Sequence, residues 1–99
     1  MPTEQDGDFE WDDVKAKSNK KKHGVAFEEA VTAFTDERSL IDADPQGNDG
    51  RFVLIGMSSE ARILYVVHAE IINKKRTRII SARIATKKEA LYYALGDAP

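Results

Sequence analysis

Residues 27–34 show the most regular pattern of hydrophobic and polar positions in the chain. Phe27, Ala30, Val31 and Phe34 recur at the spacing i, i+3, i+4 and i+7. Residues at this spacing lie on one face of an α-helix. The pattern therefore predicts an amphipathic helix that places these four side chains in the hydrophobic core.

The preceding segment, residues 13–22, is also predicted to be helical, although it has almost no apolar face. Asp12 or Asp13 can serve as its N-cap, because a carboxylate accepts hydrogen bonds from the first backbone N–H groups of a helix. Gly24 suits the position just beyond the last turn. One polar row of this helix consists of Lys15, Asn19, Lys22 and His23. Such a row faces either water or a functional site.

In the C-terminal half of the chain, the pattern of apolar and polar residues has the two-residue period of β-strands. We expect a short strand that starts at residues 40–41, and longer strands at 51–57, 62–71 and 76–84. Residues 44–50 are rich in turn-forming residues and predict a loop. Because the connections between these strands are short, the sequence predicts an antiparallel meander.

Both ends of the chain are predicted from local signals. Thr86 and Glu89 form a capping-box sequence, which predicts a final helix at 87–95. Residues 9–11 are predicted to form either a short edge strand or apolar anchors that tie the N-terminus to the core. The small and polar residues at 1–7 predict a disordered N-terminal tail. The predicted architecture is an α+β fold with an antiparallel β-meander sheet, two N-terminal helices and one C-terminal helix, in a single domain of residues 8–95.

The composition narrows the class of protein. The 99 residues include 41% hydrophobic and 32% charged residues, which is typical of one globular domain. The chain has no cysteine, which excludes disulfides and thiolate zinc sites. No apolar run approaches the roughly 18 residues of a membrane span, and the acidic N-terminus lacks the order of a signal peptide. We therefore expect a soluble cytoplasmic protein without a membrane partner.

The formal net charge of −2 hides a strong separation of charge along the chain. Residues 62–95 hold eight basic and two acidic residues, and residues 15–22 hold five lysines and no acidic residue. Two basic blocks of this kind either form solvated faces or combine into one positive patch. A positive patch with histidine, carboxylate and tyrosine groups nearby would suit a phosphodiester substrate.

The predicted strands place several polar side chains on defined faces. In the strand at 62–71, His68 and Glu70 share one face, because side chains alternate along a strand. In the strand at 76–84, Arg78 and Arg83 point to opposite faces if the strand is regular. A β-bulge near Ser81 would bring these two arginines together, and the sequence leaves both arrangements open.

These residue types match the needs of RNA cleavage without a metal ion. The reaction needs a base for the 2′-OH proton, an acid for the leaving 5′-oxygen and a cation for the charge on phosphorus. Each of these residues also has an ordinary structural explanation. The His–Glu pair can serve the fold, Arg83 can pair with Glu89, and the tyrosines can simply pack against the core. Two histidines without an H-x-x-x-H pattern predict no metal site, and no glycine-rich phosphate loop is present.

Several short motifs in this order resemble the BrnT family of type II toxin–antitoxin toxins. They are F-E-W-D (9–12), Lys15, Asn19, K-H-G-V (22–25), F-E-E-A (27–30), Gly56, Ser58, V-V-H-A-E (66–70), R-I-I-S-A-R-x-A-T-x-x-E (78–89) and Tyr93. The resemblance implies a RelE-like α+β fold and a ribonuclease that blocks translation. It also implies a BrnA-like antitoxin partner, and operator DNA bound only through that antitoxin.

The resemblance and the chemistry together suggest roles for particular residues. As catalytic residues we expect Arg83 as the transition-state cation, His68 as acid or base, Glu70 as base or as the group that orients His68, and Tyr93 as a stacking group or proton donor. As RNA phosphate-binding residues we expect Lys15, Lys22, His23, Arg62, Arg78 and Lys87. No cofactor or metal is expected, and the substrate would be mRNA, either free or on the ribosome.

Two other functions remain open from the sequence. The chain could be a non-catalytic module that binds an antitoxin and contributes to autorepression. An isolated RNA-binding domain is a third reading, although the stacking aromatics typical of RNA-binding sheets are absent.

Overall fold

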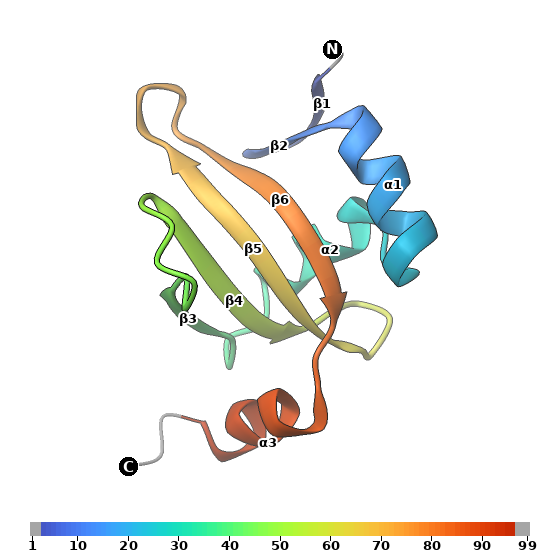
Figure 1. Ribbon diagram of the computed structural model, residues 1–99, viewed down its shortest axis with the longest axis vertical. Helices are drawn as coiled ribbons and strands as arrows, with labels where there is room; N and C mark the ends of the chain where they lie inside the picture. Colours follow the sequence, from blue (N-terminus) through green and yellow to red (C-terminus); the bar gives the residue numbers. More distant parts are fainter. Residues whose placement is uncertain (1–2, 97–99) are drawn as a thin grey trace.

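The strands of the protein form one mixed sheet, as seen in a computed structural model that describes residues 3–96 (Figure 1). The strands are β1 (Thr3–Asp6), β2 (Phe9–Asp12), β3 (Leu40–Ala43), β4 (Arg51–Met57), β5 (Ile63–Ile71) and β6 (Arg76–Ile84). The helices are α1 (Asp13–His23), α2 (Phe27–Ala33) and α3 (Lys87–Leu95), and a short 3₁₀ turn, η1 (Ile72–Lys74), joins β5 to β6.

The strand order in the six-stranded sheet is β1-β2-β6-β5-β4-β3. Strands β3, β4, β5 and β6 pair antiparallel in chain order, whereas β2 pairs parallel with β6. The sequence predicted only the antiparallel part, so the prediction of an antiparallel sheet is incomplete. The parallel pair spans two residues on each strand, Phe9 and Glu10 against Thr77 and Arg78.

The N-terminal segment departs from its prediction. The sequence predicted a disordered tail at residues 1–7, but residues 3–6 form β1, which pairs with β2. Backbone pairing does not depend on the low hydrophobicity that suggested disorder, because every N–H and C=O group can join a ladder. Met1 and Pro2 lie outside the described residues.

The core lies between α2 and one face of the sheet. Phe27, Ala30 and Ala33 of α2 are fully buried, and Val31 and Phe34 pack against them in part. From the sheet, Leu54, Leu64, Val66, Ile79 and Ala82 complete this core. The predicted amphipathic helix and its core residues are therefore confirmed. α2 lies behind the sheet in Figure 1.

The predicted helix caps are also confirmed. Asp12 accepts hydrogen bonds from Val14 N (2.9 Å) and Lys15 N (3.2 Å) at the start of α1. Gly24 ends α1 with φ 71°, a left-handed conformation that glycine adopts easily. Thr86 and Glu89 form a complete capping box at the start of α3.

A single buried amide joins α1 to the sheet. The side-chain oxygen of Asn19 accepts from Ala82 N (3.1 Å), and its nitrogen donates to Ala82 O (2.8 Å) and Val25 O (3.0 Å). Asn19 thus bonds to β6 as the backbone of a neighbouring strand would. This explains how α1 packs on the sheet although it has hardly any apolar face.

One irregularity in β6 decides where its arginines point. Val67 of β5 is paired with Ser81, but the next residue, His68, is paired with Ile79. Ile80 is therefore an extra residue, which is the defining feature of a β-bulge. The bulge near Ser81 that the sequence left open is present.

Candidate functional site

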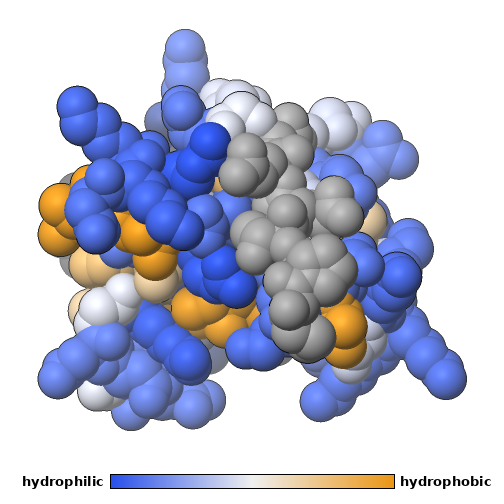
Figure 2. Space-filling view, turned by 90° about the horizontal axis from the view of Figure 1, so that it is seen from above, coloured by the Kyte–Doolittle hydropathy of each residue, from blue (hydrophilic) through white to orange (hydrophobic). Residues whose placement is uncertain are grey.

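The two faces of the sheet carry different side chains. Along β5, Leu64, Val66 and His68 are buried against the helices, while Tyr65 and Val67 are only half-buried on the opposite face. We call this opposite face the open face. The end of the molecule seen in Figure 2 is mainly hydrophilic, with hydrophobic side chains in small separate groups.

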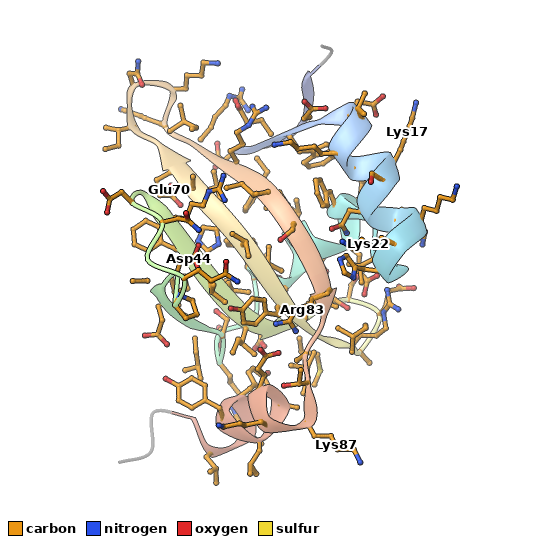
Figure 3. All side chains as sticks on the ribbon, in the orientation of Figure 1. Lys17, Lys22, Asp44, Glu70, Arg83 and Lys87 are labelled. Atoms are coloured by element: carbon orange, nitrogen blue, oxygen red, sulfur yellow. The ribbon has the colours of Figure 1, made fainter. Side chains whose placement is uncertain are left out.

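The bulge places Arg78 and Arg83 on the open face together. Arg83 is paired across the sheet with Tyr65, and Arg78 with Ala69. Tyr65 and Ala69 lie an even number of residues apart, so they share a face. Figure 3 shows Arg83 near the end of β6, with Asp44 to one side of it and Lys22 of α1 to the other.

A pocket of about 310 Å³ lies on the open face; we call it the sheet pocket. Its walls are supplied by β5 and β6, the start of β4, the end of α1 and the β3–β4 connection. It is lined by His23, Asp44, Gln46, Asn48, Arg51, Tyr65, Val67, Ile80, Ser81, Ala82 and Arg83. Most of these side chains can donate or accept hydrogen bonds.

A second hollow of about 220 Å³ continues the sheet pocket along α1; we call it the lysine hollow. It is lined by Lys15, Ser18, Asn19, Lys22, His23, Ile80 and Ser81. The two hollows share His23, Ile80 and Ser81. Together they form one depression that runs from the lysines of α1 to Arg83.

A larger hollow, of about 590 Å³, lies elsewhere, between α1 and α2. Trp11 and Phe27 contribute apolar lining, and its rim mixes lysines with Asp13 and Glu28. The mixed rim largely cancels its charge, whereas the lysine hollow has two lysines and no carboxylate in its lining. The open-face depression is therefore the better candidate for an anionic ligand.

Arg83 is held firmly at one end of this depression. Its Nη1 and Nη2 donate to the two oxygens of Glu89 at 2.8 and 2.9 Å, and its guanidinium carbon lies 3.9 Å from the centre of the Tyr65 ring. The hydrogen bonds to Glu89 raise the pKa of Arg83, and those from Arg83 lower the pKa of Glu89. Burial raises the pKa of Tyr65. The site thus holds a permanent cation on an aromatic platform.

His68 lies away from Arg83, in the core. Only 2% of its surface is exposed, and its ring contacts Phe34 edge-on with 4.9 Å between centres. Its Nδ1 lies 3.3 Å from Val66 O, and burial lowers the pKa of the imidazole. The expectation that His68 and Arg83 act in one site does not fit this geometry, because the sheet separates them.

The other two predicted catalytic residues are also engaged elsewhere. Glu70 is exposed and accepts from the hydroxyl of Thr77 at 3.0 and 3.2 Å. Tyr93 donates to Asp36 at 2.5 Å, which anchors α3 to the end of α2, and this bond raises the pKa of Tyr93. The four residues predicted as catalytic do not converge.

Two of the predicted phosphate-binding arginines form ion pairs within the fold. Arg62 binds Glu29 through two nitrogens and donates to Gly24 O at 3.1 Å, which ties the β4–β5 connection to α2. Arg78 binds Glu10, which is only 3% exposed, at 2.6 Å. A buried carboxylate needs such a partner, so both arginines serve the fold.

The remaining predicted phosphate-binding residues divide into two places. Lys15, Lys22 and His23 meet at the lysine hollow. Lys87 is exposed at the start of α3, and Figure 3 shows it pointing away from the sheet. The structure therefore brings together Lys15, Lys22, His23 and Arg83, and leaves the other predicted residues outside the depression.

Several residues of the depression were missed by sequence reasoning. They are Asp44, Gln46, Asn48, Arg51, Tyr65 and Ser81. Tyr65 and Ser81 follow from the open face once the pairing of β5 with β6 is known. For the loop residues, only the density of polar side chains at 44–50 gave a signal, and turn formation explained it equally well.

Neither a metal cluster nor a membrane span is found within residues 3–96. No three His, Cys, Asp or Glu side chains of this part come together as metal ligands. None of its helices has the length and hydrophobicity that a membrane span requires.

Comparisons with known proteins identify the family. Residues 11–89 match the family model described as "Ribonuclease toxin, BrnT, of type II toxin-antitoxin system". The fold is similar to the crystal structure of the Brucella abortus ribonuclease toxin BrnT, with a TM-score of 0.63 and 22% identity, covering 78% of this chain and 94% of that one. A search of curated proteins gave no match. Because the family model spans most of the sequence, the chain belongs to the BrnT family of ribonuclease toxins of type II toxin–antitoxin systems.

Proposed function

We propose that this protein is a metal-independent endoribonuclease that cleaves mRNA and thereby inhibits translation in the cytoplasm. In this proposal a BrnA-like antitoxin neutralises it, operator DNA is reached only through that antitoxin, and the fold is of the RelE-like type. The observation that carries the proposal is the continuous depression of the sheet pocket and the lysine hollow. This depression brings the guanidinium of Arg83, the imidazole of His23 and the two lysines Lys15 and Lys22 together on the open face.

His23 takes the acid–base role that the sequence suggested for His68. It lies at the end of α1, is half-buried and lines both hollows. His68 is buried behind the sheet, so it could not reach an RNA on the open face. We therefore assign a structural role to His68 and propose His23 as the general acid or base.

The chemistry follows from these positions. A base removes the proton of the 2′-OH, the 2′-oxygen attacks phosphorus, and the bond to the 5′-oxygen breaks as that oxygen takes up a proton. The products are a 2′,3′-cyclic phosphate and a 5′-hydroxyl. Arg83 stabilises the added negative charge on phosphorus, and because Glu89 and Tyr65 already hold its guanidinium, little reorganisation is needed.

Lys15 and Lys22 hold the phosphates next to the cleaved one. Both are exposed on α1 and line the lysine hollow. Contacts of this kind release counterions from the nucleic acid, so RNA binding should weaken steeply as salt increases.

The first test is cleavage of a defined RNA by the purified protein in the presence of EDTA. We expect the wild type to cleave, and His23→Ala and Arg83→Ala to lose at least about a hundredfold in rate, as is typical for the loss of an acid–base or electrostatic group. Lys74→Ala, in the exposed β5–β6 connection far from the depression, is the control. Circular dichroism of each variant checks that it is folded.

Phosphate binding is tested separately with a pair of matched variants. Lys15→Ala with Lys22→Ala should weaken RNA binding and reduce its salt dependence. Lys17→Ala is the control, because Lys17 lies on the same helix, is 79% exposed and pairs with Asp13. Equal losses in the two proteins would contradict the assignment of the lysine hollow.

A second candidate function is a non-catalytic module that binds an antitoxin. It is favoured by the pairing of Arg83 with Glu89, which neutralises much of the charge in the site. Growth of cells that express the chain alone distinguishes the two. Growth arrest that Arg83→Ala relieves supports the ribonuclease. Normal growth, together with no cleavage of free or ribosome-bound mRNA, supports the binding module.

A further inference from the structure

The β3–β4 connection, residues 44–50, forms one wall of the sheet pocket. Asp44, Gln46 and Asn48 from this connection supply a carboxylate and two amides to the lining. The opposite side continues into the lysine hollow. A phosphate group is attracted to the lysines and repelled by Asp44. The loop wall therefore suits the uncharged part of a nucleotide, which is its base.

The Asp44 carboxylate is held in a fixed orientation. One oxygen accepts from Gln46 N at 2.9 Å and the other from Asn48 Nδ2 at 2.9 Å. The hydrogen bond from Asn48 lowers the pKa of Asp44, so the group is ionised near neutral pH and acts only as an acceptor. Each oxygen keeps capacity for a second hydrogen bond, because a carboxylate has about four lone-pair sites.

The floor and size of the pocket suit one unpaired nucleotide. Tyr65, Val67 and Ile80 give an aromatic and aliphatic floor, and Arg83 stacks on the Tyr65 ring. A volume of about 310 Å³ has room for one base with its sugar. Recognition of single-stranded RNA commonly uses a base that is turned out of the strand into such a pocket.

The hydrogen-bonding edges of the four bases differ in a way that a carboxylate can distinguish. The Watson–Crick edge of guanine presents two adjacent donors, N1–H and N2–H. Adenine, cytosine and uracil each place an acceptor beside their donor on this edge. An ionised carboxylate forms two parallel hydrogen bonds with guanine alone.

We propose that the sheet pocket is a base-recognition subsite that selects guanine in single-stranded RNA, with the Asp44 carboxylate accepting from N1–H and N2–H. This inference rests on the proposed function in one respect, since the ligand is taken to be RNA. It adds what the ribonuclease reads next to the bond that it cleaves. Gln46 and Asn48 act as positioning residues that hold the carboxylate.

The test measures binding rather than cleavage, so that it does not depend on activity. The probes are four labelled hexaribonucleotides, UUUGUU, UUUAUU, UUUCUU and UUUUUU, with a 2′-deoxy residue at the fourth position to prevent cleavage there. Fluorescence anisotropy gives the Kd of each. We expect the guanine probe to bind about tenfold more tightly than the others, the size typical of one bidentate base contact.

Two matched variants test whether Asp44 is responsible for the guanine preference. Asp44→Asn keeps an oxygen for one of the two hydrogen bonds within the loop and replaces the other acceptor oxygen with an amide donor. The guanine preference should therefore fall to about twofold or less, while UUUUUU binds at least as tightly as before. Asp49→Asn makes the same charge change in the same loop, outside the pocket lining, and should keep the full preference.

The possible outcomes separate this inference from the proposed function. Tight binding of another base, or a guanine preference that survives Asp44→Asn, overturns the guanine subsite alone. Equal binding of all four probes does the same and leaves the ribonuclease proposal intact. If none of the probes binds, the subsite is overturned, and the proposed function is decided separately by the cleavage and growth experiments described above.

Discussion

Asn19 shows how one residue can replace an apolar face. Helix α1 carries five lysines and few apolar side chains, yet the Asn19 amide fixes it to β6 through two hydrogen bonds to Ala82 and forms a third to Val25. The sequence placed Asn19 in a polar row that faced either water or a site. The row does border the candidate site, but Asn19 itself is 7% exposed and serves the fold. Its partner Ala82 is 63 residues away, so no local pattern could have revealed this role.

Asn19→Ala should lower the free energy of unfolding by about 2–4 kcal/mol. The change leaves buried backbone groups of Ala82 and Val25 without partners, and each such group costs about 1–3 kcal/mol. Urea unfolding followed by circular dichroism measures the effect. Ser18→Ala, an exposed position on the same helix, is the control and should change stability by less than about 0.5 kcal/mol. A loss of similar size in both variants would contradict the argument.

At the scale of whole elements, the sequence predicted most of the fold because the signals are local. The bounds of β4, β6 and α3 agree with the predicted ranges, and the caps at Asp12 and Thr86 are present. Which face a side chain occupies depends on pairing between strands. The extra residue Ile80 shifts the residues of β6 that precede it, including Arg78, to the opposite face of the sheet. The sequence offered no signal that decided whether this bulge is present. The candidate site was therefore predicted only in part.

Helix α3 is joined to the site through the pair of Glu89 and Arg83, and this pair should limit RNA affinity. Glu89→Gln keeps a residue suited to the capping box but removes the negative charge beside Arg83. We expect RNA to bind about two to five times more tightly, which corresponds to ~0.5–1 kcal/mol for one partly exposed charge. Anisotropy titration at low salt measures this.

The matched control for this prediction is Glu28→Gln. Glu28 is exposed on α2 and belongs to the hollow on the other side of α1. The Glu28→Gln variant therefore makes the same change of charge as Glu89→Gln, but at a distance from Arg83. An equal gain in affinity in both variants would mean that only the overall charge of the protein matters.

For the molecule as a whole, ion pairs connect different elements of the fold, and two of the pairs join segments that are far apart in the chain. Arg62 pairs with Glu29, Arg78 with Glu10, and Arg83 with Glu89. The basic residues that made the C-terminal third look like a nucleic-acid surface are thus partly used inside the fold. The composition therefore overestimated the number of cations that are available to an anionic ligand.

The same pairs predict how stability depends on pH. Hydrogen bonds from Arg62 lower the folded-state pKa of Glu29, and those from Arg83 lower that of Glu89, below the ordinary value of 4.5. Groups with a lowered folded-state pKa contribute stability that is present above the unfolded pKa and is lost as the pH falls through the folded one. We therefore expect the free energy of unfolding to drop as the pH falls below about 4.5.

Thermal unfolding between pH 3 and pH 7 measures this dependence. Glu29→Gln should be less stable than the wild type near neutral pH and should show a shallower decline towards pH 3. Glu60→Gln, at an exposed carboxylate of the β4–β5 connection, should retain the wild-type slope. A decline in Glu29→Gln that is as steep as in the wild type would show that other carboxylates dominate.

The amide of Asn19 also occupies backbone hydrogen-bonding groups on the edge of β6. β2 pairs with β6 only at Thr77 and Arg78, and further along the strand the bonds of Asn19 to Ala82 take the place of a neighbouring strand. If α1 comes away during partial unfolding, this edge becomes available to a second molecule, since unpaired strand edges recruit other strands. Self-association on heating should therefore begin with the detachment of a lysine-rich helix, and Asn19→Ala should aggregate at a lower temperature than its loss of stability alone would explain.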